Sequence, residues 1–447
     1  MSENKIIEPR TLPGFMELLP NEQIQFNRIK KIIQETYEKF GFLPIDTPVI
    51  ESSEVLLAKA GGETEKQIYR FYKGDTDLSL RFDLTVPLAK YVAKNYGVLT
   101  FPFRRYQIGK VYRGEKTQKG RYREFYQCDI DIIGDGELSI MNDAEIPSII
   151  YHIFSQLDFG KFTIRFNNRK LLSGFFKYLE LEDKITDILR TVDKIDKVGK
   201  EVVTEMLEEI GIEEEKSKKI VEFVSTKENV IEFLEALGIE DETFKQGLEE
   251  IKVVSKYMND FGIPTEYYKI DLSIARGLDY YTGTVYETIV DEHPELGSVC
   301  SGGRYDNLAE FYTNKKLPGV GISIGLTRLF YVLNEYKLIK ENEQKSISKA
   351  IIIPMVENLS YPIKVATKLR EKGINAEIYL EQKAMKKKMN YANKQNIPYA
   401  IIIGEDEVAN KTVTVKNMMT GEQETKKVEE IDYNLNWFYR LCKPAWL

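Results

Sequence analysis

Residues 112–129 read YRGEKTQKGRYREFYQCD, and they join two runs with strand character, 105–113 and 123–133. The lysines, glycines and glutamine between the runs are typical of a loop, so we predict a long antiparallel hairpin. Residues 103–123 carry a net charge of +7, although the whole chain of 447 residues carries −7. Such a basic hairpin is either a solvated surface or a structure that directs guanidinium groups at phosphates.

The regions on both sides of this hairpin predict a mixture of helices and strands. An apolar stripe predicts a first helix that begins at Pro20 and ends before Gly41. Residues 42–50, with two prolines, indicate an extended segment at a sheet edge. Further elements are a strand at 78–82, a helix at 86–94, helices throughout 170–261, strand character at 270–290 and a strand entering a helix at 319–334.

The end of the chain has a different pattern. KENEQKSIS at 340–348 is polar and indicates a linker, and the segments after it alternate buried strands such as KAIIIP with helices. We therefore predict a domain of residues 1–340 with a helical insertion at about 170–261, a linker at 341–348, and a small α/β domain at 349–447.

Composition limits the classes of protein. Hydrophobic residues make up 43% and aromatic residues 11%, which excludes a disordered chain. No apolar run approaches the roughly 18 residues of a membrane helix, and the first residues do not resemble a signal peptide, so we expect a cytoplasmic protein without a membrane partner. Three widely spaced cysteines and two histidines predict no protein-bound structural metal and no histidine-based catalysis. Chemistry must depend mainly on Arg, Lys, Asp, Glu, Tyr and Gln.

Three separated patterns resemble motifs of one enzyme class. GFLPIDTPVI at 41–50, the hairpin at 112–129 and GVGISIGLTRLF at 319–330 resemble, in this order, motifs 1, 2 and 3 of class II aminoacyl-tRNA synthetases. ARGLDYYTGTVYE at 275–287 and SGGRYDNL at 301–308 look like the signature peptides of the histidyl-tRNA synthetase family. LSLRFDLTVPLAKY at 78–91 is similar to that family's amino-acid-binding segment.

This resemblance implies both a fold and an activity. The fold is α+β, a class II catalytic core with a mainly antiparallel sheet, the helical insertion, and a C-terminal α/β anticodon-binding domain. The activity is ligation of L-histidine to tRNA(His) through a histidyl-adenylate, with ATP converted to AMP and pyrophosphate for protein biosynthesis. The resemblance also implies Mg²⁺ accompanying ATP and a homodimer formed through the first motif.

The residue types suit this chemistry. Adenylate formation joins a carboxylate to the α-phosphate of ATP, so the site must bring two anions together and stabilise the charge that develops. Planar guanidinium groups, which stay charged, serve that purpose without a strong base. The resemblance implies that Arg113 and Arg276 are catalytic, on opposite sides of the α-phosphate and close to the histidine substrate. It implies that ATP is bound by Arg113, Glu115, Phe125 and Arg328.

The resemblance also implies an amino-acid pocket and a tRNA contact. It places the histidine ammonium group at Asp83, Thr85 and Gln127, the two ring nitrogens at Asp131 and Tyr281, and Tyr280 in the pocket wall. It places the acceptor end of the tRNA at Lys116, Gln118, Lys119 and Arg121. Spacing alone shows that Gln127 and Asp131 share one face of a strand. Strand packing explains Tyr280 and Tyr281 equally well.

Two departures from the family pattern keep an alternative open. Thr327 stands where the third motif usually has an acidic residue, and Ser323 replaces a glycine. An inactive relative that regulates ATP phosphoribosyltransferase is one alternative, and a nucleic-acid-binding module without ligase activity is another. The intact second motif and the C-terminal domain favour the synthetase.

The predicted C-terminal domain carries a net charge of +4, and four lysines cluster at the start of one predicted helix. These are Lys383, Lys386, Lys387 and Lys388. They indicate an edge that contacts the phosphates of an anticodon arm. A domain that only braces a dimer is the alternative.

Overall fold

The computed structural model describes residues 7–58, 63–116, 119–274, 280–307, 309–338 and 345–431. These form two compact units, one of 7–17 and 29–338 and one of 18–28 and 345–431. The predicted linker begins outside the described residues, so its limits stay a prediction. Within the described ranges, no helix is both long and apolar enough to cross a membrane.

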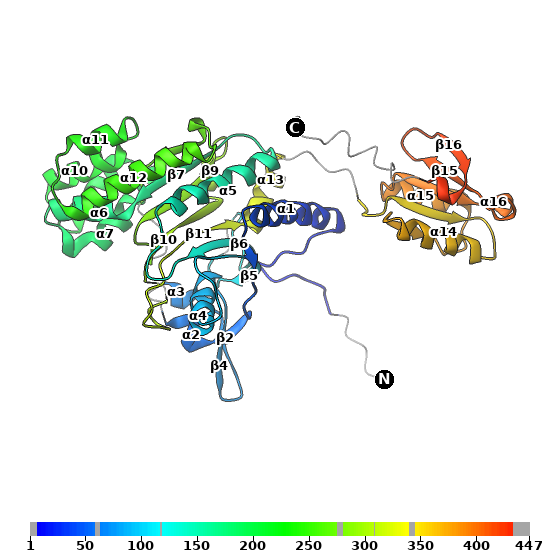
Figure 1. The fold of residues 1–447 in the computed structure, drawn as a ribbon, viewed down its shortest axis with the longest axis horizontal. Coiled ribbons are helices and arrows are strands. Elements are labelled where there is room, and N and C mark those ends of the chain that lie inside the picture. Colours follow the sequence, from blue (N-terminus) through cyan, green and yellow to red (C-terminus); the bar gives the residue numbers. More distant parts are fainter. Residues whose placement is uncertain are drawn as a thin grey trace. The chain divides into compact units, whose positions relative to one another are not determined.

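The first unit is built on an eight-stranded sheet (Figure 1). In spatial order its strands are β1 (Leu43–Pro44), β5 (Phe103–Tyr112), β6 (Glu124–Ile133), β11 (Gly319–Gly325), β10 (Cys300–Tyr305), β9 (Thr284–Val290), β7 (Phe162–Asn168) and β8 (Tyr268–Ile270). The pairs at the two ends are parallel, and the pairs between them are antiparallel. The predicted hairpin is β5–β6, and the prediction of a mainly antiparallel sheet is confirmed.

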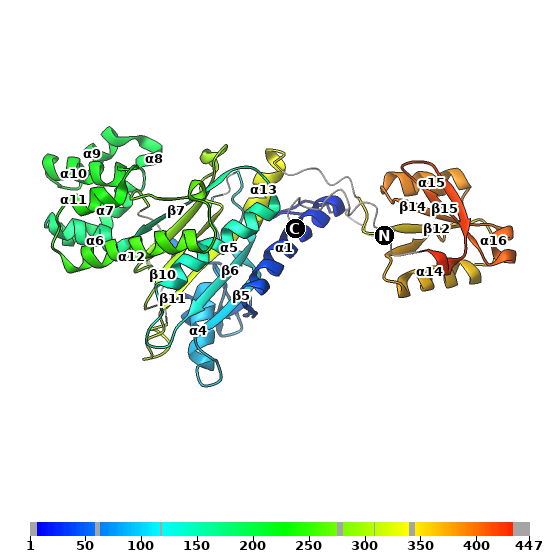
Figure 2. The ribbon, with the colours of Figure 1, turned by 45° about the horizontal axis from the view of Figure 1, so that its top comes forward.

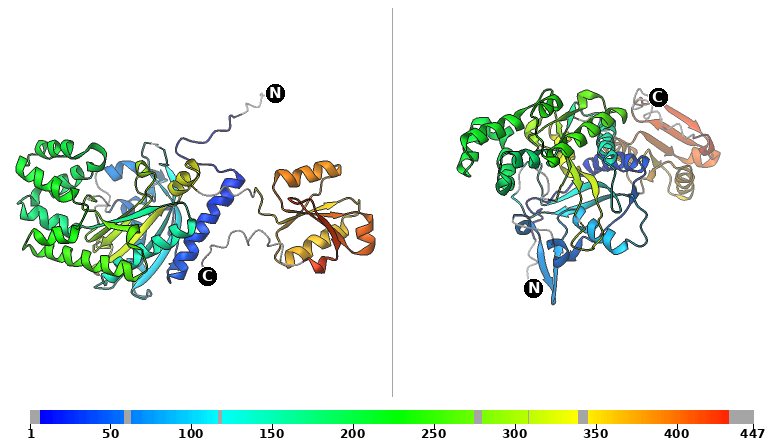
Figure 3. Two further views of the ribbon diagram at one scale, coloured as in Figure 1. Left: turned by 90° about the horizontal axis from the view of Figure 1, so that it is seen from above. Right: turned by 60° about the vertical axis from the view of Figure 1, so that its left-hand side comes forward.

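Helices cover one face of this sheet. α1 (Pro20–Lys39) and α5 (Met141–Leu157) run along it together with α13 (Leu326–Glu335), as Figures 2 and 3 show. The Tyr37 hydroxyl of α1 donates to the Cys128 carbonyl of β6 at 2.9 Å. Asp143 of α5 pairs with Arg304 of β10, both buried. The opposite face of the sheet is therefore available for a site.

Alternation along β6 and β11 separates these two faces. Ile130 and Ile132 of β6 lie in register with Ile322 and Val320 of β11, and all four are buried apolar residues. Because successive side chains of a strand point to opposite faces, the polar residues between them point away from the apolar ones. The central strands thus carry a hydrophobic layer on one face and a polar one on the other.

A small antiparallel sheet and three helices complete the wall near the first motif. The strands are β2 (Ile50–Ser52), β4 (Thr76–Leu80) and β3 (Arg70–Lys73), and the helices are α2 (Ser53–Leu57), α3 (Glu63–Gln67) and α4 (Thr85–Asn95). The predicted strand at 78–82 and the helix at 86–94 correspond to β4 and α4. Of the predicted extended segment 42–50, Leu43–Pro44 form β1 at the edge of the main sheet and Ile50 begins β2 of the small sheet.

The insertion is helical, as the sequence pattern predicts. Its helices are α6 (Arg169–Tyr178), η1 (Glu182–Lys184), α7 (Ile185–Val192), α8 (Ile195–Val198), α9 (Lys200–Glu209), α10 (Glu214–Ser225), α11 (Val230–Ala236) and α12 (Glu242–Asp260). Phe175 and Phe223 stack with ring centroids 4.0 Å apart in its core. The short turn η2 (Thr265–Tyr267) lies between α12 and β8, and η3 (Pro294–Leu296) lies between β9 and β10.

The second unit has a five-stranded sheet with helices on both faces. Its strands, in spatial order, are β13 (Ala376–Ile378), β12 (Ala350–Pro354), β14 (Tyr399–Ile403), β15 (Val413–Asn417) and β16 (Gln423–Lys426). Its helices are α14 (Ser360–Glu371), α15 (Met385–Lys394), α16 (Glu405–Asn410) and η4 (Val428–Glu430). Ile352 packs in the core with α14, whereas its neighbours Ile351 and Ile353 pack in a second core with α15.

One prediction about this unit is wrong. Lys383, Lys386 and Lys387 are exposed, but Lys388 is buried and its Nζ donates to the Pro354 carbonyl at 2.5 Å. Lys388 therefore ties α15 to the end of β12 and does not belong to a phosphate-contacting edge. Its position three residues after Met385, on the inner side of the helix, explains why a count of lysines could not show this.

Candidate active site

Two adjoining cavities lie on the polar face of the central strands. The larger has a volume of about 840 Å³, within the usual range for a small-molecule site, and the smaller has about 270 Å³. They share Arg113, Arg121, Gln127, Ser298, Ser301, Ser323 and Arg328. A molecule in one cavity would therefore contact side chains that also reach a molecule in the other.

β6 supplies the floor of the larger cavity. Gln127, Asp129 and Asp131 alternate along it and all line the cavity, as the strand period requires. In register with Asp131 on β11 is Gly321, where an added Cβ would collide with the Asp131 carboxylate. A glycine at this point of the third motif therefore makes room for a carboxylate of the second.

Two partners hold Asp131. Its Oδ1 accepts from the Tyr305 hydroxyl at 2.7 Å, and its Oδ2 is paired with the guanidinium of Arg105, which is fully buried. Burial raises the pKa of Asp131, and the charge of Arg105 together with these hydrogen bonds opposes that rise. Asp131 is thus a carboxylate of fixed orientation facing the cavity.

Asp83 approaches the same cavity from the loop after β4. Its Oδ1 accepts from the Val86 backbone N–H at 3.1 Å at the start of α4, while its Oδ2 has no hydrogen-bond partner in the described part of the chain. Burial raises the pKa of Asp83 to about 6, against the opposing effects of the Val86 N–H and the charge of Arg113. Asp83 Oδ2 can therefore accept a hydrogen bond from a ligand in the cavity.

Aromatic side chains form the wall. Tyr280 and Tyr281 both line the larger cavity, with ring centroids 5.0 Å apart and planes at 66°. Burial raises the pKa of both hydroxyls, so each stays protonated and can donate. Both neighbours reach the cavity because the chain at this point precedes β9 and is not yet an extended strand.

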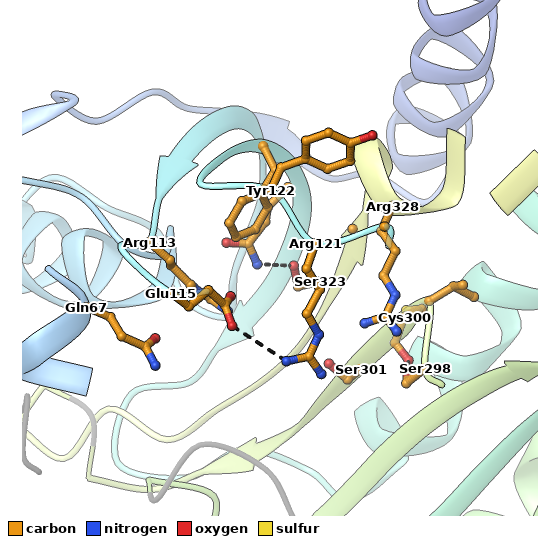
Figure 4. A pocket seen from close by; sticks show the side chains of 15 residues that line it. Gln67, Arg113, Glu115, Arg121, Tyr122, Ser298, Cys300, Ser301, Ser323 and Arg328 are labelled. Atoms are coloured by element: carbon orange, nitrogen blue, oxygen red, sulfur yellow. Dashed lines mark hydrogen bonds and ion pairs between the residues drawn. The ribbon is translucent and has the colours of Figure 1, made fainter. Parts of the chain in front are cut away.

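The smaller cavity is lined by charged residues of the hairpin and of α13. The Arg113 guanidinium lies 5.2 Å from the Phe125 ring centroid, and its Nε donates to the Phe82 carbonyl at 3.0 Å. Figure 4 shows Arg121 reaching Glu115, a pair separated by 3.5 Å, while Arg328 also points into the cavity. Guanidinium groups from two elements thus converge, as polyphosphate binding requires.

Most of the predicted site residues in the described ranges come together at these cavities. The larger cavity is lined by Asp83, Thr85, Arg113, Gln127, Asp131, Tyr280 and Tyr281. The smaller is lined by Arg113, Glu115, Phe125 and Arg328. Arg276 and Gln118 lie outside the described residues. Lys116 and Lys119 are exposed and line neither cavity, whereas Arg121, predicted at the tRNA, lines both.

The sequence interpretation missed several cavity residues. Asp129 was detectable, because it lies two residues from both Gln127 and Asp131 and must share their face. Tyr305 and Ser323 carry no such signal, and neither does Arg105, which lines neither cavity but pairs with Asp131. The approach of all three depends on the register of strands that are distant in sequence. The insertion contributes too: Asp196 lines the larger cavity and pairs with Arg165 at 3.1 Å.

Ser323 and Thr327, the two residues that depart from the family pattern, both hydrogen-bond to residues of β6. The Ser323 Oγ accepts from Gln127 Nε2 at 2.6 Å, and the Thr327 Oγ1 accepts from the Tyr126 backbone N–H at 2.8 Å. Both residues therefore hold the second motif against the third. Thr327 is also buried, so its hydroxyl serves the packing of α13 and not a ligand.

Comparison with known proteins identifies the family. The family model described as histidyl-tRNA synthetase matches residues 14–329, and one described as an anticodon binding domain matches 349–435. A histidine–tRNA ligase of Clostridium tetani is 60% identical over 428 residues, covering 95% of this chain and 97% of the relative. The chain belongs to the histidyl-tRNA synthetase family.

Further relatives agree with this family. A histidine–tRNA ligase of Clostridium acetobutylicum is 48% identical, with 96% of this chain and 100% of the relative covered. The crystal structure of a Nostoc histidyl-tRNA synthetase is similar with a TM-score of 0.86 and 39% identity, covering 95% of this chain and 99% of that one. A Bacillus halodurans structure titled as an ATP phosphoribosyltransferase regulatory subunit/histidyl-tRNA synthetase shares the fold, at 20% identity and a TM-score of 0.72. The class II core with a C-terminal anticodon-binding domain is thereby confirmed.

Proposed function

We propose that this protein ligates L-histidine to tRNA(His) in two steps, through a histidyl-adenylate, with conversion of ATP to AMP and pyrophosphate. The family and the intact second motif support the ligase over a regulatory subunit. The observation that carries the proposal is Arg113, which lines both cavities. A guanidinium in that position can contact an amino-acid carboxylate on one side and a phosphate on the other.

In this proposal the larger cavity takes histidine. Asp83 and Gln127 present acceptors for the ammonium group, while Asp131 and Tyr281 face the ring nitrogens. A buried site that pairs each polar atom of its substrate rejects analogues that lack one of them. Arg276 would meet the α-phosphate opposite Arg113, an assignment that rests on the family motif alone.

The smaller cavity takes ATP, with Glu115, Phe125 and Arg328 as its contacts. Mg²⁺ would accompany the nucleotide. Within the described residues no group of three or more His, Cys, Asp or Glu side chains is placed to hold a metal, and Glu115 is the one carboxylate lining the smaller cavity. Mg²⁺ usually takes one or two carboxylates plus substrate phosphates, so this lining fits an ion carried chiefly by ATP.

The remaining partners are tRNA and a second copy of the chain. Lys116 and Lys119 are exposed residues between β5 and β6, in the hairpin that lines the smaller cavity. The acceptor end of a tRNA would approach the cavity past this loop. Leu43 and Ile50, beside the sheet edge, are 60% and 48% exposed, and apolar residues on a strand edge suit burial in a homodimer. The second unit would bind the anticodon arm.

The test is an ATP–pyrophosphate exchange assay with each of the twenty amino acids, followed by charging of tRNA(His). The proposal predicts exchange with histidine alone and loss of that exchange in Arg113→Ala. A regulatory subunit would bind histidine without exchange, and a nucleic-acid-binding module would bind tRNA without either response. Light scattering of the purified protein tests the homodimer.

A further inference from the structure

The floor of the larger cavity holds a third carboxylate without an assigned role. Asp129 lies on β6 between Gln127 and Asp131, lines the cavity and is 2% exposed. Within the described ranges its Oδ1 has no hydrogen-bond partner. A buried carboxylate oxygen without a donor is costly, so this atom indicates a ligand that supplies one.

The charged neighbours of Asp129 do not supply that donor. Arg105 on β5 attracts it but is paired with Asp131, and Asp131 and Asp83 repel it. Ser323 on β11 hydrogen-bonds it. The other titratable groups that sense its charge are Tyr281, Tyr37, Cys128 and Cys300. Asp83, Asp129 and Asp131 therefore all interact with the charge of one fully buried guanidinium, that of Arg105. The basic residues that line the cavity, such as Arg113, are less buried than Arg105.

The unsatisfied atoms match the chemistry of an ammonium group. Asp83 Oδ2, Gln127 Oε1 and Asp129 Oδ1 are buried acceptors without partners in the described chain. An ammonium group has three N–H donors. The Thr85 hydroxyl, by contrast, is already hydrogen-bonded to Tyr280.

We propose that Asp129 is a further residue of the amino-acid site, and that its free oxygen accepts a hydrogen bond from the α-ammonium group of histidine beside Asp83 and Gln127. The proposal rests on the proposed function, since it concerns the same substrate. It adds a specificity element: the ammonium is held by two carboxylates, so a substrate without that charge is excluded.

This role gives the site a defined dependence on pH. Burial raises the pKa of Asp129 to about 7, with Arg105 and Ser323 opposing the shift. Below that pH the group is neutral and resembles asparagine. Above it the group is an anion that attracts the ammonium, and its contribution to histidine binding is present only there.

The experiment measures KM for histidine and for ATP in pyrophosphate exchange, from pH 6 to pH 8.5, for the wild type and Asp129→Asn. We expect the ratio of histidine KM values, variant over wild type, to rise from near one at pH 6 to about tenfold or more at pH 8.5. KM for ATP should change less than about twofold. Protonation of histidine in solution changes KM of the wild type and of the variant by the same factor, so it cancels in this ratio.

A matched control is Asp143→Asn, which alters a buried, paired carboxylate on the helical face of the sheet. It should lower the melting temperature without a pH-dependent KM ratio. If Asp129→Asn does not fold, Asp129→Ser replaces it, and calorimetry of the wild type at pH 7 in two buffers must show proton release on histidine binding. A wild type without histidine-dependent exchange refutes the proposed function. An active wild type with a KM ratio near one at pH 8.5, or a ratio independent of pH, overturns the role of Asp129 alone.

Discussion

The hydroxyl of Tyr305 donates a 2.7 Å hydrogen bond to Asp131 Oδ1, and it arrives from β10, two strands away from β6. Gly321 on the intervening strand leaves the space that this contact needs. Arg105, from β5 on the other side, pairs with Oδ2. The proposed ring-binding carboxylate is therefore held from both flanking sides of its own strand.

Tyr305→Phe should raise KM for histidine about tenfold, because the Asp131 carboxylate loses a charge-assisted hydrogen bond and its fixed orientation. KM for ATP should stay within about twofold. Tyr312→Phe is the control, since the Tyr312 hydroxyl donates to the Val55 carbonyl at 2.8 Å and lines neither cavity. An equal rise in both KM values would mean that Tyr305 supports the sheet and not the ring site.

Arg105→Met should destabilise the fold by about 3–5 kcal/mol near pH 8, because it leaves buried carboxylates uncompensated. The loss should shrink as the pH falls toward 5. Without Arg105, the pKa values of Asp131 and Asp129 in the folded protein rise further above their values in the unfolded chain. A carboxyl group with a raised pKa in the folded state stabilises the fold at low pH, and this stabilisation is lost as the pH rises through the folded-state pKa. Thermal melting of both proteins across this pH range is the measurement. A deficit independent of pH would contradict the charge argument.

Ser323→Ala should raise KM for histidine about fivefold to tenfold. The 2.6 Å bond from Gln127 Nε2 to Ser323 Oγ orients the amide so that its Oε1 faces the cavity, and the variant removes that partner. The melting temperature should change little, since the removed hydroxyl leaves only a small space. Ser323 also hydrogen-bonds Asp129, so a variant with unchanged KM would show that neither Gln127 nor Asp129 needs this hydroxyl to bind histidine.

The loop lysines and Arg121 should behave differently, although they are neighbours in sequence. Lys116→Ala with Lys119→Ala should weaken tRNA charging and flatten its salt dependence, because phosphate contacts release counterions. Pyrophosphate exchange should be nearly unchanged, because both lysines lie outside the cavities. Arg121→Ala should instead reduce exchange, since its guanidinium lines both cavities and pairs with Glu115. If the lysine variant lost tRNA charging and pyrophosphate exchange to the same extent, the loop would contribute to ATP binding and not to tRNA binding.

A chain ending at Leu338 should retain histidine-dependent exchange and lose most tRNA charging at physiological salt. The described residues that line the two cavities all precede this point, and the second unit has its own sheet and cores. The measurements are both assays on protein shown to be folded by thermal melting. A truncated protein that charged tRNA normally would contradict an anticodon role, and the dimer-brace alternative predicts a shift to monomers.

Periodicity predicted the elements whose pattern is strong. The hairpin β5–β6, the helical insertion and the start of the second unit follow from alternation, helical spacing and turn residues. α5 escaped prediction because Pro147 stands in its interior, and prolines are expected to break helices. β15 and β16 escaped because they are short and mostly polar, with only Val413 and Val415 of β15 buried.

The residues of the site also fall into those that the sequence predicts and those that it does not. Residues within recognisable motifs, such as Asp83 and Gln127, were predictable from resemblance, and their placement at one cavity follows from strand order. Arg105 could not be predicted, because an arginine in a basic hairpin is ordinarily exposed. Its burial depends on which residue stands opposite it, and that register becomes visible only in the folded sheet.

Arg113 lines both cavities, and this has a thermodynamic consequence. If a bound nucleotide fixes that side chain, histidine no longer loses the entropy of ordering it, and the two affinities become coupled. Coupling between two binding equilibria is reciprocal: the factor by which ATP tightens histidine equals the factor by which histidine tightens ATP. A single side chain shared by two cavities thus makes each substrate an effector of the other.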